Sequence, residues 1–218
     1  PRRRVVHDVR SAAFLLASSR RPHRAAGDAG VVPALNDATA AIALPLFRRV
    51  LGDALDRTPA CVCRLHSGAA RALYRGEVQV ERGMGRLASL MAWVTSLPPA
   101  GHGPVEVDIA AHGGRERWVR RIGGREMRSR LWTRSADDLL WERLGAVVFG
   151  FALRIEDGVI VWRVDRVWAL GLLPLPSRWF REVVCRESGE GGRYRFDVRA
   201  AMPGIGLLVH YRGWLEVP

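Results

Sequence analysis

Apolar and polar side chains alternate along much of the chain after residue 71, and this alternation predicts β-strands. In the segment Ala72–Arg82, the apolar Tyr74, Val78 and Val80 stand between charged and amide side chains, as a strand with one buried face requires. Nine later segments are also predicted as strands: Val105–Ala110, Arg117–Ile122, Glu126–Thr133, Leu139–Leu144, Val147–Ile155, Val159–Val167, Val183–Glu187, Tyr194–Ala200 and Leu207–Val217.

Glycine-rich turns separate many of these segments, among them Gly113-Gly114, Gly123-Gly124 and Gly191-Gly192. Such short connections suit hairpins between antiparallel strands and leave no room for the crossover helices of a parallel sheet. We therefore predict a mainly β fold, with an antiparallel curved sheet or barrel-like meander.

Two segments before residue 100 show helical spacing instead. One is Pro45–Leu55, where the proline suits a first helical turn. The other is Gly83–Leu97, which Pro98-Pro99 would end. We expect one or two N-terminal helices to pack on the sheet, and the second to bury one face made of Leu87, Leu90, Met91 and Val94. After a break at Asp56 to Pro59, Cys61–His66 is expected to form a short second turn.

The first 40 residues differ from the rest. They open with Arg2-Arg3-Arg4 and show little apolar periodicity, so little burial is available to offset the entropy lost on ordering. We expect residues 1–40 to be an arginine-rich flexible arm or linker, at most with a loose helix around Ser11–Ser19. Residues 41–218 would then form the β domain.

The formal net charge of +12 at first suggests a nucleic-acid partner. However, all 34 residues counted as Lys or Arg are arginine. Together with the abundance of Ala, Gly, Val and Leu, the missing lysine indicates a GC-rich coding bias rather than selection for phosphate binding. A nucleic-acid partner is therefore not expected, because it would need a contiguous arginine face with aromatic side chains for stacking.

Three cysteines are present, and the spacing of Cys61 and Cys63 matches neither a redox nor a zinc motif. We expect reduced thiols and a cytoplasmic location. No apolar run approaches the roughly 18 residues of a membrane span. The histidines do not pair at metal-ligand spacing, and the chain has no dinucleotide, P-loop or nucleophile-elbow motif. Neither a metal nor another cofactor is expected.

Strand parity predicts charged groups inside the sheet. If Trp118 and Ile122 face inward, so does Arg120 between them. The same parity turns Ser129 and Glu142 inward on the next two strands. Burying either charge alone costs several kcal/mol. Arg120 and Glu142 should therefore form an ion pair that fixes the sheet, or act on a bound molecule, either by orienting a polar ligand or by transferring a proton. The remaining alternative is that the parity is wrong and both are solvated.

Further candidates come from the end of the chain and from the first strand. Tyr211 shares the parity of Val209 and Leu215 and would point inward. Glu81 precedes Gly83 at a strand-to-helix junction, where it would cap the helix or act as a general base. The uncharged segment 170–176 would fold over the barrel mouth as a lid or dock on a partner or membrane surface, and we favour the lid.

Several short motifs together resemble a known family. They run in order along roughly three-quarters of the chain and are Leu46–Gly52, Val80–Gly83, Leu97–Ala100, Glu116–Arg120, Arg128–Leu131 and Tyr211–Leu215. In this order they resemble the DUF4166 family, a bacterial family without an assigned function. The resemblance implies that a dehydrogenase-like domain can accompany this one, in cis or in trans. It implies no catalytic residues.

An aromatic-rich β region with a few inward polar groups is typical of a small-molecule pocket. We predict that the domain binds an apolar or amphipathic small molecule in a barrel-like interior, through Arg120, Ser129, Glu142, Tyr211, Trp118 and Glu81. The alternative is an enzyme of the isomerase or cyclase type acting on a hydrophobic substrate. In that case Arg120, Glu142 and Tyr211 would stabilise charge and transfer protons.

Overall fold

The computed structural model describes residues 44–218, so the expectations for the 1–40 arm and for a helix at Ser11–Ser19 lie outside the described residues. Its helices are α1 (Leu46–Leu51), η1 (Gly52–Arg57), α2 (Ala60–Ser67), α3 (Arg86–Val94) and η2 (Ser177–Phe180), of which η1 and η2 are 3₁₀ helices. Its strands are β1 (Arg71–Arg82), β2 (Gly101–His112), β3 (Arg115–Ile122), β4 (Arg125–Thr133), β5 (Leu140–Leu144), β6 (Val147–Glu156), β7 (Val159–Ala169), β8 (Leu173–Leu175), β9 (Val184–Glu190), β10 (Arg193–Met202) and β11 (Gly206–Glu216).

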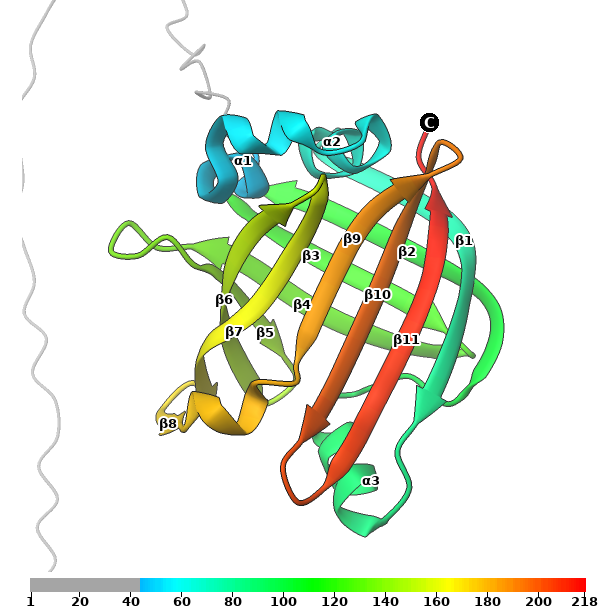
Figure 1. Ribbon diagram of the computed structural model, residues 1–218, viewed down its shortest axis with the longest axis vertical. Coiled ribbons are helices and arrows are strands. Elements are labelled where there is room, and N and C mark those ends of the chain that lie inside the picture. Colours follow the sequence, from blue (N-terminus) through cyan, green and yellow to red (C-terminus); the bar gives the residue numbers. More distant parts are fainter. Residues whose placement is uncertain (1–43) are drawn as a thin grey trace, which may run out of the picture. The chain divides into compact units, whose positions relative to one another are not determined.

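Ten of these strands form a closed antiparallel barrel (Figure 1). The hydrogen-bonded order is β6-β5-β4-β3-β2-β1-β11-β10-β9-β7, and the pairing of β6 with β7 joins the two ends of the sheet. The short β8 adds to β7 beyond the ring. The predicted mainly β, antiparallel, barrel-like fold is therefore confirmed.

The glycine turns explain how neighbouring strands meet. At Gly123 and Gly124 both φ angles are positive, at +55° and +74°, which is the backbone of a type I′ hairpin turn. The turn at Gly191-Gly192 has the same signs. Because the twist of this turn matches the right-handed twist of the strands, consecutive hairpins curl the sheet in one direction and bring its edges together.

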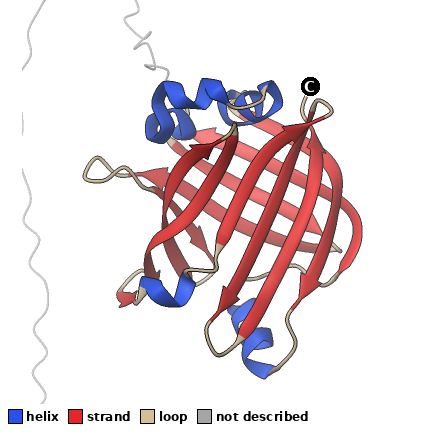
Figure 2. Cartoon of the chain, viewed as in Figure 1, coloured by secondary structure: helices blue, strands red, loops and turns tan. Residues whose placement is uncertain are grey.

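Helices lie at both ends of the barrel, as Figure 2 shows. At one end α1, η1 and α2 lie over the opening and insert apolar side chains into the core. Phe47 is fully buried, stacks on the ring of His66 with centroids 3.5 Å apart, and contacts Trp162 with centroids 5.4 Å apart. The N-terminal helices thus close this end of the core.

Two of these helices differ in type or length from the expectation. The predicted helix Pro45–Leu55 is α-helical only to Leu51, because Gly52 has a left-handed backbone with φ at +56°, and the chain continues as a 3₁₀ helix. The segment Cys61–His66 lies within the eight-residue helix α2, which is longer than the expected short second turn. Its apolar positions Cys61, Val62 and Leu65 are buried.

Helix α3 lies at the opposite end of the barrel from α1 and α2 (Figure 1), and its buried face differs from the predicted one. Ala88 and Ala92 are buried, whereas Leu87 and Leu90 are exposed. The helix packs against β11, and its two alanines belong to the buried core cluster. Met91 is only partly buried. Of the four side chains that periodicity assigned to the core, Leu87 and Leu90 therefore point outward, whereas Met91 and Val94 line the interior cavity described below.

The segment 170–176 does not form the expected lid. Leu173–Leu175 pairs with β7 as a short edge strand, and Leu170 and Leu172 are exposed. Leu175 is the residue of this segment that reaches the interior cavity described below. Backbone pairing with β7 holds the segment beside the barrel end instead of across it.

Replacing Phe47 by alanine tests whether the helices belong to the barrel core. We expect a loss of about 3–5 kcal/mol in the free energy of unfolding, because the ring is fully buried. In thermal unfolding the midpoint should fall by on the order of 10 °C. Leu44→Ala, at a side chain that is 61% exposed, is the matched control and should change the midpoint little. Equal effects of both substitutions would contradict this account.

Candidate functional site

A cavity of about 300 Å³ occupies the barrel interior. Most of its wall is apolar and is contributed by strands from around the ring, including Val105, Ile122, Phe149, Phe151, Val198 and Leu215. It extends to the barrel end that carries α3 and η2, where Met91, Val94, Trp179 and Phe180 line it. The end under α1 and α2 is filled by packed aromatic rings. One end of the barrel is therefore filled with side chains, and at the other end residues of α3 and η2 line the cavity.

The structure places the predicted inward groups on the cavity wall. The Arg120 guanidinium lies 3.6 Å from the Glu142 carboxylate and donates a hydrogen bond to the Ser129 hydroxyl at 3.0 Å. It also lies 4.7 Å from the ring centroid of Trp118. Arg120, Glu142 and Trp118 line the cavity, and Ser129 is buried beside them.

The guanidinium of Arg120 stays positively charged inside the barrel. Burial alone disfavours a charged guanidinium, but the nearby Glu142 carboxylate and other groups outweigh it and raise the pKa of Arg120 above its ordinary value. Since an arginine is already charged at any physiological pH, this side chain presents a permanent cation to the cavity. Arginine has five N–H donors, so donors remain beyond those used by Ser129 and Glu142.

Two tyrosines add neutral hydroxyl groups to the same cavity. Tyr211 on β11 and Tyr194 on β10 are both buried and line the cavity. Burial raises the pKa of Tyr211, and burial together with the charge of Glu187 raises the pKa of Tyr194 well above its ordinary value. Both phenols therefore stay protonated near neutral pH and can donate hydrogen bonds.

A second buried pair was missed by the sequence analysis. His66 Nε2 on α2 lies 2.7 Å from a carboxylate oxygen of Glu187 on β9, and both side chains are almost fully enclosed. Glu187 also lines the cavity. Among the described residues, His66 Nδ1 and Trp162 Nε1 have no hydrogen-bond partner. A signal for Glu187 was present, because it alternates with Val183 and Cys185 on one face of the predicted strand Val183–Glu187.

Glu116 is a third buried carboxyl group, close to the filled end. It accepts a hydrogen bond from Trp118 Nε1 at 2.8 Å and is 8% exposed. Burial raises its pKa, while the hydrogen bond from Trp118 and the proximity of His66 act in the opposite direction. The net elevation means that the folded state holds the proton of Glu116 more tightly than an unfolded chain does.

Glu81 does not join the interior group. Its side chain is half exposed on the outer face of β1 and lies 3.3 Å from Arg212. The helix-capping role also fails, because α3 begins after Gly85 and no side chain caps it. The remaining predicted ligand-binding residues lie together, but their role in binding a ligand stays a prediction.

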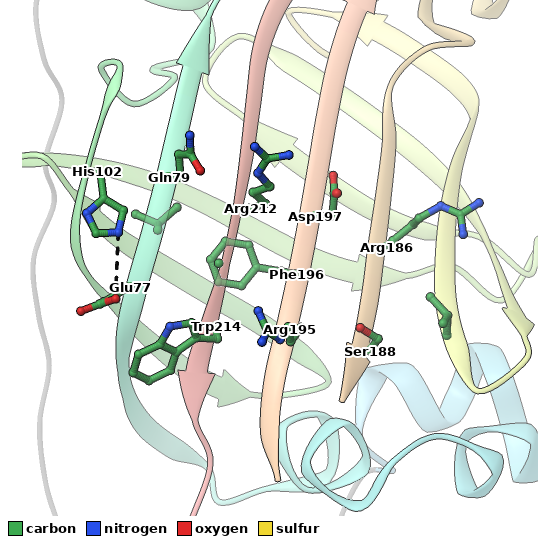
Figure 3. A pocket seen from close by; sticks show the side chains of 13 residues that line it. Glu77, Gln79, His102, Arg186, Ser188, Arg195, Phe196, Asp197, Arg212 and Trp214 are labelled. Carbon is green, nitrogen blue, oxygen red and sulfur yellow. Dashed lines mark ion pairs between the residues drawn. The ribbon is translucent and has the colours of Figure 1, made fainter. Parts of the chain in front are cut away.

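A shallow depression of about 530 Å³ lies on the outer face of β1, β11, β10 and β9 (Figure 3). Its charged groups are largely paired with one another or with neighbours. His102 lies 4.0 Å from Glu77, and His210 lies 2.9 Å from Asp197. Because acidic side chains alternate with the arginines here, this surface is not the contiguous arginine face that nucleic-acid binding would need.

Residues 44–218 contain no cluster of three or more His, Cys, Asp or Glu side chains arranged to hold a metal ion. Within the same residues, no helix is long and apolar enough to cross a membrane. Cys61, Cys63 and Cys185 are free thiols. Burial raises the pKa of Cys185 well above its ordinary value, so the cavity contains a neutral thiol rather than a reactive thiolate.

A double-mutant cycle tests the interior ion pair. Glu142→Leu leaves the Arg120 charge buried without its partner and should lower the free energy of unfolding by about 3–5 kcal/mol. Adding Arg120→Met should restore at least half of that loss, as measured by urea denaturation. As the control, Glu106→Leu breaks the surface pairs with Arg75, 2.8 Å away, and Arg121, 3.9 Å away, and should cost less than about 1 kcal/mol. If Glu142→Leu costs as little stability as Glu106→Leu, the Arg120–Glu142 pair is hydrated, and its assignment as a buried ion pair is contradicted.

The elevated pKa of Glu116 predicts a pH dependence of stability. The stability contributed by its proton is fully present below the unfolded pKa, near 4.5, and is lost as the pH rises through the folded pKa. Glu116→Gln cannot ionise and can still accept the hydrogen bond from Trp118. Its melting temperature should therefore rise relative to the wild type between about pH 4 and pH 8.

Thermal unfolding of both proteins across this range measures the effect. The solvent-exposed Glu81→Gln is the matched control, because its carboxylate lies on the outer face. A difference between wild type and Glu116→Gln that is constant with pH, or that changes in the opposite direction, would refute the burial effect.

Comparison with known proteins places the barrel in a family. The family model described as "Domain of unknown function (DUF4166)" matches residues 59–215, from the residue before α2 to the last but one residue of β11. Helix α1 lies before the matched region. No match was found among curated proteins. Since the model spans nearly the whole barrel and more than half of the chain, the chain belongs to the DUF4166 family.

Proposed function

We propose that this domain binds an apolar or amphipathic small molecule inside the barrel. The observation that carries the proposal is the interior cavity, whose apolar wall contains a charged pair and hydroxyl groups. Ligand pockets typically combine hydrophobic walls with a few placed polar groups, and their volumes begin near 300 Å³. A cavity of this size and lining is larger than packing defects in ordinary cores, which rarely exceed one water molecule.

The polar groups suggest how a ligand would be oriented. Arg120 and Tyr211 both line the cavity, and both can donate hydrogen bonds to an oxygen atom of the ligand. The hydrocarbon part would lie against the aromatic wall around Phe149 and Phe151, whose rings are 5.5 Å apart. Transfer of hydrocarbon from water to this wall supplies the affinity, and the polar groups select the end that faces Arg120.

An enzyme of the isomerase or cyclase type is the second candidate. Glu142 faces the cavity beside the neutral phenol of Tyr211, so a carboxylate and a hydroxyl group both face a bound molecule. These are the groups that a proton transfer on a hydrophobic substrate requires. Chemical change of the bound molecule, lost in Glu142→Gln while binding persists, would favour this candidate over a binding module.

Titration with a fluorescent fatty acid tests the binding proposal. We expect saturable binding with one site per chain. Ala200→Phe places a ring into the cavity wall and should weaken binding at least tenfold, which corresponds to about 1.4 kcal/mol. The matched control is Ala111→Phe at the exposed end of β2, which should leave affinity unchanged. Equal affinity of both variants would place the probe outside the barrel and overturn the proposal.

A further inference from the structure

Large apolar side chains that are exposed to solvent gather at one end of the barrel. One group belongs to the loop before α3 and to its outward face. It consists of Met84, Leu87, Leu90 and Trp93, which are 94%, 58%, 49% and 76% exposed. Single exposed leucines are common on proteins, but neighbouring large apolar side chains at this exposure mark an interaction surface.

A second group comes from the chain after β7. It consists of Leu170, Leu172 and Leu173, together with Trp179 of η2. Together the two groups form what we call the apolar rim. It contains eight of the ten large hydrophobic side chains that are exposed among the described residues.

The two halves of the rim belong to one surface. The turn between β5 and β6 connects them, because a Cβ atom at Gly145 would touch the carbonyl of Val94 and the amide of Leu170 donates to the carbonyl of Ala146 at 2.6 Å. Residues from α3 and η2 also line the same cavity. Figure 1 shows α3, η2 and β8 at the same end of the barrel. The rim therefore lies at the cavity end that the N-terminal helices do not cover.

The charges at this end have one predominant sign. Five chain segments form this end, and together they contain six arginines and one acidic residue, Glu182. The segments are residues 82–101, 122–125, 143–147, 169–184 and 200–208. Glu182 already faces Arg199 at 3.4 Å. Five of the six arginines are exposed and form no ion pair with described residues: Arg86, Arg125, Arg143, Arg178 and Arg181.

We infer that this end of the barrel docks on the surface of an anionic lipid bilayer. The apolar rim would enter the boundary between headgroups and acyl chains, and the arginines around it would contact lipid phosphates. Tryptophan suits this depth because its ring is apolar and its N–H is polar. The inference rests on the rim and its charges and does not require that the cavity hold a ligand.

A second copy of the chain fits this surface less well. Two copies meeting through their rims would bring the same unpaired arginines together, and like charges across an interface oppose association. An anionic bilayer complements both features at once, because it offers hydrocarbon to the rim and negative charge to the arginines.

Flotation of the full chain with lipid vesicles tests the docking. We expect binding to phosphatidylcholine vesicles that contain roughly a third phosphatidylglycerol, and at least tenfold weaker binding to phosphatidylcholine alone. The variant Leu87→Ser/Trp93→Ser/Leu172→Ser keeps every charge and should lose at least tenfold in binding. Its matched control, Leu44→Ser/Leu73→Ser, alters the two exposed leucines outside the rim and should bind as the wild type does.

Charge and position are tested separately. Arg178→Glu/Arg181→Glu should weaken binding at least tenfold, whereas the equally charged change Arg154→Glu/Arg163→Glu, at exposed positions on β6 and β7, should weaken it far less. Brominated acyl chains should quench tryptophan fluorescence in the wild type and not in Trp93→Phe/Trp179→Phe. Equal losses of vesicle binding in the two charge variants would show that overall charge alone attracts the protein to the vesicles. Quenching that is the same in Trp93→Phe/Trp179→Phe as in the wild type would show that the rim does not enter the bilayer. Either result would overturn the inference.

Two further outcomes would also overturn it. If the wild type fails to bind anionic vesicles, the rim does not dock on lipid. If the chain forms a dimer without lipid and the three rim serines abolish it, the rim is an interface between copies. If Ala200→Phe loses fatty-acid binding but still binds anionic vesicles, the rim docks on lipid independently of the cavity, and both proposals are supported.

Discussion

Pairing of β6 with β7 closes the sheet into a ring, and the chemistry of the interior depends on that closure. In an open sheet, an inward arginine near an edge can reach water. In the barrel, every second side chain of ten strands faces a space with little water, so Arg120, Glu142 and Glu187 must find partners there. The ion pair at 3.6 Å and the His66–Glu187 contact at 2.7 Å are the result.

The two charged pairs have different surroundings. His66 and Glu187 lie under stacked aromatic rings, with Phe47 directly on His66, so this pair is part of the packed end. Arg120 and Glu142 line the cavity wall itself. A molecule in the cavity would meet the second pair directly, and it would meet the first through Glu187 alone. This difference favours Arg120 as the group that orients a ligand and assigns His66 a largely structural position.

Strand parity predicted much of the interior because successive side chains of a strand point to opposite faces, so one inward residue fixes the direction of its neighbours. Once Trp118 was placed inside, Arg120 followed, and the same reasoning placed Ser129, Glu142 and Tyr211. The His66–Glu187 contact joins residues 121 positions apart and depends on how α2 lies over the barrel, which local pattern does not contain. Periodicity failed in part for α3. It placed Met91 and Val94 toward the interior correctly, but Ala88 and Ala92 are buried in place of Leu87 and Leu90, which are exposed.

The failed predictions for α3 and for the segment 170–176 share one physical cause. Sequence pattern treats a large apolar residue as a core residue, yet a barrel buries side chains in its interior and not at its rim. Helices α1 and α2 cover the apolar residues at one end. At the other end α3 and η2 are themselves the outermost elements, and their outward apolar side chains have no cover among residues 44–218. The cavity extends to that same end. The apolar rim therefore lies at the end to which the cavity extends, so whatever surface covers the rim also lies next to that end of the cavity.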